Sequence, residues 1–159
     1  MAGIYIHIPF CKKACNYCDF HFSTSLNYVD EMVEAICNEI RLKSVRLKGQ
    51  SIDSIYFGGG TPSVLTTQSF LKIFEVIDQY FSVSSTAEVT MEANPDDLDQ
   101  QKIISLKQLP VNRLSIGIQS FFDEDLIWMN RAHSAVEADS CIKRSQDAGF
   151  DNLSIDLIY

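Results

Sequence analysis

The chain has 159 residues, a length that suits about one domain, and 46% of them are apolar, which is ordinary for a protein with a packed core. Its formal net charge is −8, with 13 basic and 21 acidic residues, so a nucleic-acid partner is not expected. No apolar run approaches the ~18 residues of a membrane span. Residues 1–10 lack the features of a signal peptide, so we expect a cytoplasmic location.

The first half of the chain alternates between strand-like and helix-like segments. Strands are predicted at residues 3–8, 52–57 and 87–92, because β-branched and aromatic residues are frequent there. Helices are predicted at residues 28–47 and 67–81, where apolar residues recur every three or four positions. The second of these strands runs directly into the sequence GGGTP.

The same alternation continues after the third strand. Asp96 or Asp97 is predicted to cap a helix that ends before Pro110, and a strand follows at residues 113–118. Asp123 is predicted to start a further, short helix that runs to about residue 129.

The chain closes on one more helix and one more strand. The sequence SAVE from Ser134 matches a capping box, and it predicts a helix that runs to Ala148 and stops at Gly149. The last strand is predicted at residues 153–158. Five alternating units indicate an α/β fold with a parallel sheet. Because five units cannot close an eight-stranded barrel, we favour a fragment of a barrel, with residues 1–159 as one domain, over an open sheet.

Three of the five cysteines lie within the eight residues CKKACNYC, as Cys11, Cys15 and Cys18. In a reducing compartment such a cluster is more typical of metal or redox chemistry than of disulfides. This spacing lets three thiolates reach one soft metal centre from a single loop. Lys12 and Lys13 should favour the deprotonated thiols. A cubane iron–sulfur cluster usually takes four cysteines, so three would leave one iron open for chemistry.

Zinc is the alternative for this loop, with His21 as the fourth ligand. The spacing alone leaves both metals open. A zinc site would not, however, explain the three consecutive glycines that begin at Gly58. Such a run suggests that the backbone approaches a ligand closely. The other two cysteines, Cys37 and Cys141, fall in the middle of predicted helices and are expected to be small core residues.

A special residue stands near the carboxyl end of every predicted strand, which is the functional edge of parallel α/β folds. After the cysteines and the GGGT segment come Glu92, Gln119 and Asp156. Asp156 interrupts an apolar strand, and a buried carboxylate needs a partner. Arg131 could be that partner, a clamp for a ligand carboxylate, or an ordinary surface charge. His7, inside the first strand, is expected to be a core histidine.

The cysteine segment resembles the C-x3-C-x-aromatic-C signature of the radical S-adenosylmethionine (SAM) superfamily. The other motifs resemble the oxygen-independent coproporphyrinogen III oxidases and their relatives, and together they span nearly the whole chain. The matching segments are YIHIPFC from Tyr5, GGGTP from Gly58, EANP from Glu92, NRLSIGIQ from Asn112, NRAH from Asn130 and DLIY from Asp156.

This resemblance implies the N-terminal part of a partial (β/α) radical SAM barrel, with substrate-binding portions beyond Tyr159. It also implies a [4Fe–4S] cluster on Cys11, Cys15 and Cys18, with SAM as the ligand of the fourth iron. The positions that match the SAM contacts of the family are Tyr5, Gly59, Gly60, Thr61, Glu92, Gln119, Arg131 and Asp156. Their charges suggest that Glu92 lies near the SAM ammonium, Arg131 near its carboxylate, and Asp156 and Gln119 near its ribose hydroxyls.

One departure from the family pattern bears on function. The oxidases carry a fourth nearby cysteine, whereas Phe20 stands in that place here, so the segment looks like the HemW branch of heme chaperones. Those proteins are similar to the oxidases but bind heme and pass it to acceptor proteins. Three hypotheses stay open: a heme chaperone with a radical-type cluster, an oxidase that decarboxylates coproporphyrinogen propionates, and a zinc-stapled α/β binding module. Heme or porphyrin and a heme-acceptor protein are the expected partners, and no residue is assigned a catalytic role.

Overall fold

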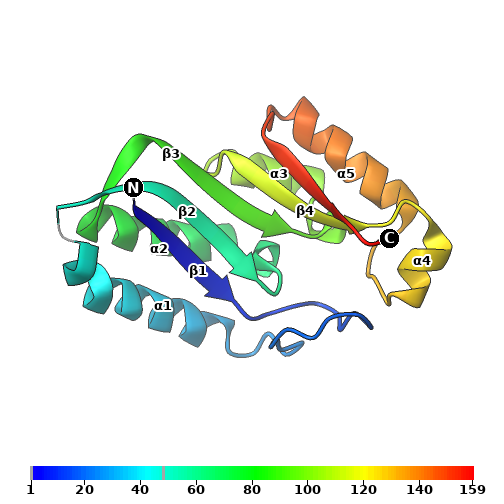
Figure 1. Cartoon of the computed structure of the whole chain (residues 1–159), viewed down its shortest axis with the longest axis horizontal. Coiled ribbons are helices and arrows are strands. Elements are labelled where there is room, and N and C mark those ends of the chain that lie inside the picture. The colour runs from blue at the N-terminus through cyan, green and yellow to red at the C-terminus, as the bar shows by residue number, and fades with distance from the viewer. Residues whose placement is uncertain (1, 48) are drawn as a thin grey trace.

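Five parallel strands form one sheet in the computed structural model, which describes residues 2–47 and 49–159 (Figure 1). The strand order is β1-β2-β3-β4-β5, so each strand pairs with the one that follows it in the chain. The strands are β1 (Ala2–Ile8), β2 (Ser51–Gly59), β3 (Ser82–Ala93), β4 (Arg113–Gln119) and β5 (Leu153–Leu157). The predicted α/β fold with a parallel sheet is therefore confirmed.

Helices connect successive strands and pack against one face of the sheet (Figure 1). They are α1 (Val29–Lys43), α2 (Thr67–Tyr80), α3 (Gln100–Leu106), α4 (Asp123–Trp128) and α5 (Ala135–Asp147), with short 3-10 turns η1 (Ser44–Leu47), η2 (Pro62–Val64) and η3 (Pro95–Asp97). The core lies between the sheet and helices α1, α2, α3 and α5. At its centre, the ring of Phe57 meets the rings of Phe70 and Phe74 edge-on, each at 5.3 Å between centroids. None of the helices in the described ranges is long and apolar enough to cross a membrane.

The period-two alternation of strand residues gives the sheet one apolar and one polar face. In β1, Ile6 and Ile8 are buried beneath the helices, whereas Tyr5 and His7 point to the opposite, exposed face. His7 is therefore not the core histidine that the sequence led us to expect. No helix of residues 2–47 and 49–159 covers the polar face (Figure 1).

The segment between β3 and β4 differs most from the prediction. Asp96 and Asp97 do not cap a helix but lie in the turn η3, and α3 begins only at Gln100. Asp99 is the true cap, because its carboxylate accepts the backbone N–H of Lys102 at 2.7 Å. The earlier two carboxylates cannot serve as caps, since they are engaged by a lysine from the cysteine segment.

Most other element boundaries agree with the predictions to within a few residues. The capping box at Ser134 is present, with both reciprocal hydrogen bonds to Glu137. Gly149 takes the left-handed backbone conformation (φ 83°) that ends α5. Cys37 and Cys141 are fully buried, as expected of small core residues. Strand β3 begins five residues before its predicted start, and β2 continues into the first two glycines of GGGTP.

Candidate functional site

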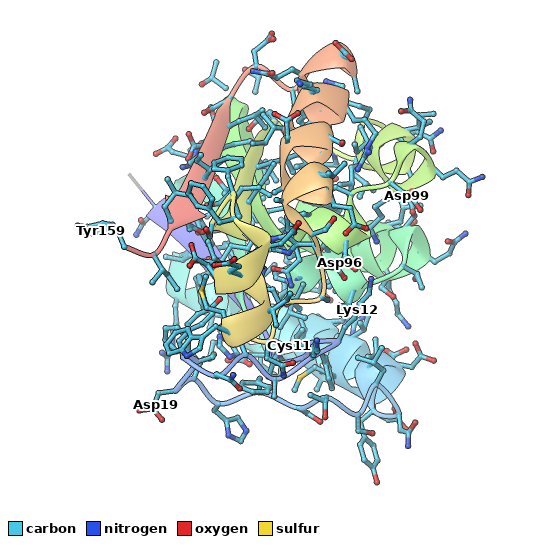
Figure 2. The ribbon with its side chains drawn as sticks, turned by 90° about the vertical axis from the view of Figure 1, so that its right-hand side faces the viewer. Cys11, Lys12, Asp19, Asp96, Asp99 and Tyr159 are labelled. Atoms are coloured by element: carbon cyan, nitrogen blue, oxygen red, sulfur yellow. The ribbon has the colours of Figure 1, made fainter. Side chains whose placement is uncertain are left out.

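A cavity of about 380 Å³ lies at the carboxyl ends of the strands, on the side that faces the viewer in Figure 2. All eleven residues predicted for the site line it: the three clustered cysteines and the eight positions matched to SAM contacts. They come from segments up to 151 residues apart in sequence, from Tyr5 to Asp156. Their convergence follows from the parallel order of the strands, which brings every carboxyl end to the same edge.

The cysteine segment is a loop after β1 that is held in place by distant parts of the chain. The backbone N–H of Cys11 donates to the Ser23 carbonyl at 3.0 Å. Further along, the Asn16 side chain donates to the Trp128 carbonyl at 2.6 Å, where α4 ends. The Asn130 side chain donates to the Ala14 carbonyl at 2.7 Å. The loop is therefore fixed by protein contacts alone, on both sides of Cys15.

The two lysines beside Cys11 do not act on the thiols as predicted. Lys12 pairs with Asp96 at 3.2 Å and also with Asp97, so its charge is already offset. Burial works to lower the pKa of Lys12, but its hydrogen bonds and the two aspartate charges outweigh burial, and the pKa is raised. Lys13 donates to the Arg131 carbonyl at 3.2 Å. Lys12 is thus an anchor between the cysteine loop and η3.

Arg131 and a threonine, rather than the lysines, donate hydrogen bonds to the cysteine sulfurs. The Nη1 group of Arg131 lies 3.3 Å from Sγ of Cys15, and the Thr61 hydroxyl lies 3.5 Å from Sγ of Cys11. Burial nevertheless raises the pKa of the Cys11 thiol, although the Thr61 hydrogen bond and the Arg131 charge work in the opposite direction. Arg131 also donates to the Tyr17 hydroxyl at 3.2 Å, and burial raises the pKa of that phenol to about 12.

Glycines at the end of β2 allow the backbone to pass close to the cysteine loop. A Cβ atom added to Gly60 would lie 2.7 Å from the Phe10 carbonyl and 3.0 Å from Sγ of Cys11. Gly59 has a φ of +113°, and an added Cβ would lie 2.6 Å from the His7 ring. The protein's own packing therefore requires glycine at both positions, in addition to any close approach of a ligand.

Glu92 is held at the end of β3 by two donors. Its carboxylate accepts the Tyr56 hydroxyl at 2.7 Å and the Gly59 backbone N–H at 3.1 Å. Burial, followed by the hydrogen bond and charge of Glu92, raises the pKa of Tyr56 to about 12. The phenol therefore remains a donor at neutral pH, and the carboxylate faces the cavity in a fixed orientation.

Asp156 is not the buried partner of Arg131. It is exposed, because β5 pairs with β4 alone and its inner face is open within the described chain. Both Nη atoms of Arg131 instead bond to protein groups: Cys15, Tyr17, the Asn94 side chain and the Gly117 carbonyl. Its Nε atom is buried without a partner. Asp156 still lines the cavity, so its side chain is free to meet a ligand.

The cavity also contains residues that the sequence reasoning did not assign. Ser115 and Gly117 share the polar face of β4 with Gln119, and Asn94 follows β3 directly. Period-two alternation from Gln119 would have found the first two. Asn94 stands in the EANP motif, but its neighbour Glu92 has the more obvious chemistry.

The zinc alternative requires the three thiols and His21 to converge on one point. Within residues 2–47 and 49–159, no three His, Cys, Asp or Glu side chains form a group that could hold a single metal ion. All five cysteines are free thiols. All three clustered thiols are therefore available as ligands.

Comparison with known proteins decides the family. The radical SAM superfamily profile matches residues 5–159. The chain belongs to the radical SAM superfamily. It is 38% identical to the heme chaperone HemW of Bacillus subtilis (strain 168) over the whole chain, and 32% identical to HemW of Escherichia coli (strain K12) over 99% of it. In both comparisons the chain spans 42% of the relative's length.

Solved structures show the same radical SAM fold. Coproporphyrinogen III oxidase HemN from Escherichia coli, described as a radical SAM enzyme, matches with a TM-score of 0.91 and 27% identity, over 99% of this chain and 37% of HemN. HydG, a maturase of the [FeFe]-hydrogenase, matches with a TM-score of 0.67 at 12% identity, over 98% of this chain and 34% of HydG, which indicates the fold alone.

The radical SAM superfamily generally uses a [4Fe–4S] cluster and SAM, and the residues of the cavity fit both groups. Three free thiols come from one loop, and two of their sulfurs already accept hydrogen bonds. The cavity offers a fixed carboxylate in Glu92 and an unpartnered donor in Nε of Arg131, which suit a ligand that carries both an ammonium and a carboxylate.

Proposed function

We propose that this chain binds a [4Fe–4S] cluster through Cys11, Cys15 and Cys18, and SAM in the adjoining cavity. The observation that carries the proposal is the convergence of all eleven predicted residues on one cavity. Bound together, a cluster and SAM supply one-electron and radical chemistry that no side chain can supply. Residues 1–159 would then form a radical SAM core domain.

The chain's own residues would bind and orient SAM. Glu92 would accept from its ammonium group, since the carboxylate is fixed by Tyr56 and Gly59. Arg131 would face its carboxylate through the free Nε donor. Asp156 and Gln119 would accept or donate at the ribose hydroxyls, while Tyr5 and the glycine segment would line the remaining surface.

We further propose that the whole protein handles heme as a heme chaperone and passes it to an acceptor protein. The similarity to several HemW proteins supports this proposal, as does Phe20 at the place where the oxidases carry a cysteine. Phe20 lines the cavity and is 76% exposed, so an apolar ring stands at its mouth where a flat macrocycle could lie. Free, clustered thiols also suit a cytoplasmic location.

Coproporphyrinogen III oxidation is the second candidate, because the backbone matches HemN with a TM-score of 0.91. An oxidase must bind a substrate with four carboxylates, which calls for several cationic groups. The chain's formal net charge is −8, and two basic residues, Lys13 and Arg131, line the cavity, which is fewer than the four carboxylates of such a substrate. The heme chaperone therefore agrees better with the described residues.

Anaerobic purification tests the cluster first. We expect iron and inorganic sulfide near four of each per chain and a broad brown absorbance near ~400 nm. Stoichiometric zinc without sulfide would overturn the proposal. Heme titration of the protein, beside a coproporphyrinogen turnover assay on the same sample, then separates the two functions: a chaperone binds heme and leaves coproporphyrinogen unchanged, whereas an oxidase converts it.

A further inference from the structure

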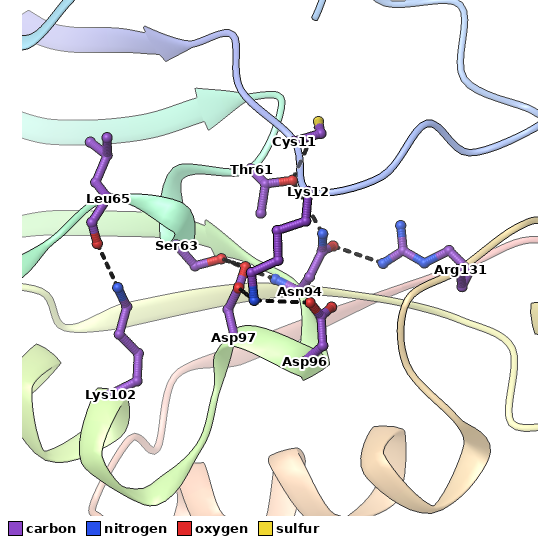
Figure 3. Close-up of polar contacts among 10 residues, drawn as sticks. All are labelled: Cys11, Lys12, Thr61, Ser63, Leu65, Asn94, Asp96, Asp97, Lys102 and Arg131. Carbon is purple, nitrogen blue, oxygen red and sulfur yellow. Dashed lines mark hydrogen bonds and ion pairs between the residues drawn. The ribbon is translucent and has the colours of Figure 1, made fainter. Parts of the chain in front are cut away.

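Asn94 lies between Arg131 and Thr61, and Thr61 in turn bonds to Sγ of Cys11 (Figure 3). Its side-chain oxygen accepts Nη2 of Arg131 at 2.7 Å, and its side-chain nitrogen lies 3.1 Å from the Thr61 hydroxyl oxygen. Arg131 donates to the sulfur of Cys15, and Thr61 donates to the sulfur of Cys11. One amide thus connects both donors.

The direction of every hydrogen bond in this network is fixed by chemistry. A guanidinium group only donates, so the Asn94 oxygen must face Arg131 and its NH₂ group must face Thr61. The Thr61 oxygen therefore accepts from Asn94, which directs its own hydrogen toward Sγ of Cys11. Because each bond polarises the next, the network strengthens the donation to sulfur.

Asn94 is itself held rigidly. Its backbone N–H donates to the Ser63 hydroxyl at 3.3 Å, and that hydroxyl donates to the buried Asp97 carboxylate at 2.6 Å. Lys12, next to Cys11, pairs with the same carboxylate. Gly117 lies close to the Asn94 side chain, since a Cβ added there would be 3.3 Å from the Asn94 oxygen.

We propose that Asn94 is a positioning residue that aims hydrogen-bond donors at two of the three cluster sulfurs and thereby raises the cluster's reduction potential. A hydrogen bond donated to a ligand sulfur withdraws negative charge from the cluster and so favours its reduced state. Hydrogen bonds of this kind are one of the general ways in which proteins set the reduction potential of iron–sulfur clusters. Among the described residues, no side chain donates to the third sulfur, that of Cys18. The inference rests on the proposed cluster binding.

The test is a potentiometric titration of the anaerobically reconstituted chain, followed by EPR of the reduced cluster. Asn94→Ala loses the hydrogen bonds of the amide to Arg131 and to Thr61. The midpoint potential of the cluster should therefore fall and its EPR signal should change shape, with the iron content retained. We expect a fall equivalent to at least a tenfold change in the ratio of reduced to oxidised cluster, about 59 mV for a one-electron couple. Asn94→Asp should fall further, because it adds a negative charge and cannot donate to Thr61.

Three further variants separate positioning from a general loss of stability. Asn112 also uses its amide to bond two backbone groups, those of Val89 and Ala87, but at the far end of the sheet. Asn112→Ala should destabilise the fold and leave the potential unchanged. Thr61→Val should reproduce part of the Asn94→Ala shift, and the double variant Thr61→Val/Asn94→Ala should shift by less than the sum.

The possible failures are distinct. A wild-type chain without iron and sulfide would overturn the proposed function. A loaded wild-type chain whose Asn94→Ala variant keeps both its potential and its EPR signal would overturn the role of Asn94 alone. If Asn94→Ala takes up no cluster, Thr61→Val decides: an unchanged potential in that variant would also overturn the inference.

Discussion

At the scale of single residues, the position of a side chain at the strand ends could be predicted from the sequence, but its bonding partners could not. The cysteines and the residues that end strands could be placed on one edge because strand polarity fixes that edge. The partners of those residues could not be predicted. Lys12 is adjacent to Cys11 in sequence yet turns away to pair with Asp96 and Asp97, and Arg131 reaches Cys15 across 116 positions. Such pairings depend on loop paths that no periodicity describes.

Glu92 gives the most direct residue-scale prediction. Glu92→Gln keeps an acceptor for Tyr56, but it removes the charge that would face the SAM ammonium and also the acceptor for the Gly59 N–H, because an amide has only one oxygen. A charge-assisted hydrogen bond contributes about 1.5–3 kcal/mol, so SAM affinity should fall roughly 10- to 100-fold. Equilibrium dialysis under nitrogen measures this. Glu88→Gln is the matched control, because Glu88 lies on the same strand, bonds to Thr90 and Asn152, and does not line the cavity. Equal affinity in the two variants would contradict the role of Glu92.

His133 gives a prediction for pH. Its Nε2 atom faces the Ile118 carbonyl at 3.0 Å, and its Nδ1 atom is buried without a partner. Burial, and then the Arg131 charge, lowers the pKa of this imidazole. As the pH drops below the usual histidine pKa of about 6.5, the unfolded chain therefore binds more protons than the folded chain. The free energy of unfolding accordingly decreases as the pH decreases.

Urea denaturation at pH 7.5 and pH 5.5 tests this effect. The wild-type chain should lose more stability over this interval than His133→Gln, in which the amide can still donate to the Ile118 carbonyl. Equal losses in the two proteins would show that His133 does not contribute to the acid sensitivity.

At the scale of elements, sequence patterns predicted the helices and strands better than their ends. The capping box at Ser134 was predictable because both of its partners lie within four residues. The start of α3 was predicted wrongly: Asp96 and Asp97 were the expected caps, but both pair with Lys12, and Asp99 is the cap. Likewise, the extra length of β3 comes from pairing with β2 at Ser51 and Ile52, which the local composition does not reveal.

Ser134→Ala should weaken the start of α5. Loss of an N-cap hydroxyl costs about 1 kcal/mol, which for a chain of this size lowers the melting temperature by roughly 2–4 °C. Differential scanning calorimetry measures the shift. Ser140 provides the control on the same helix, since its hydroxyl bonds only to the Val136 carbonyl one turn earlier. Ser140→Ala should leave the melting temperature nearly unchanged, and an equal shift in both variants would argue against the cap.

At the scale of the whole molecule, the apolar core and the site occupy different parts of one sheet: the core lies beneath the helices, and the cavity lies at the carboxyl ends of the strands. The apolar core beneath the helices contains Phe57, Phe70 and Phe74, whereas the clustered cysteines lie in a partly exposed loop at the strand ends. Stability therefore depends mainly on the face that the helices cover, and the proposed chemistry on the carboxyl ends of the strands.

This separation predicts two opposite phenotypes. The triple variant Cys11→Ala/Cys15→Ala/Cys18→Ala should lose iron completely and keep the far-UV circular dichroism and the unfolding free energy of the cluster-free wild type. Phe57→Ala should keep the three thiols but lose about 3–5 kcal/mol of stability. Denaturant titration of the cluster-free proteins measures both. A triple variant that fails to fold would contradict the separation.

The tether between Asn16 and the end of α4 has a consequence for how the protein is made. The bonded groups are 112 positions apart, so at synthesis rates of about 5–20 residues per second the ribosome would release the cysteines roughly 6 to 22 s before their anchor. During that interval the thiols would be unprotected against oxidants. The loop therefore has its full set of contacts only after the α4 segment has been translated, and a bound cluster would be held by a fully anchored loop only from that point.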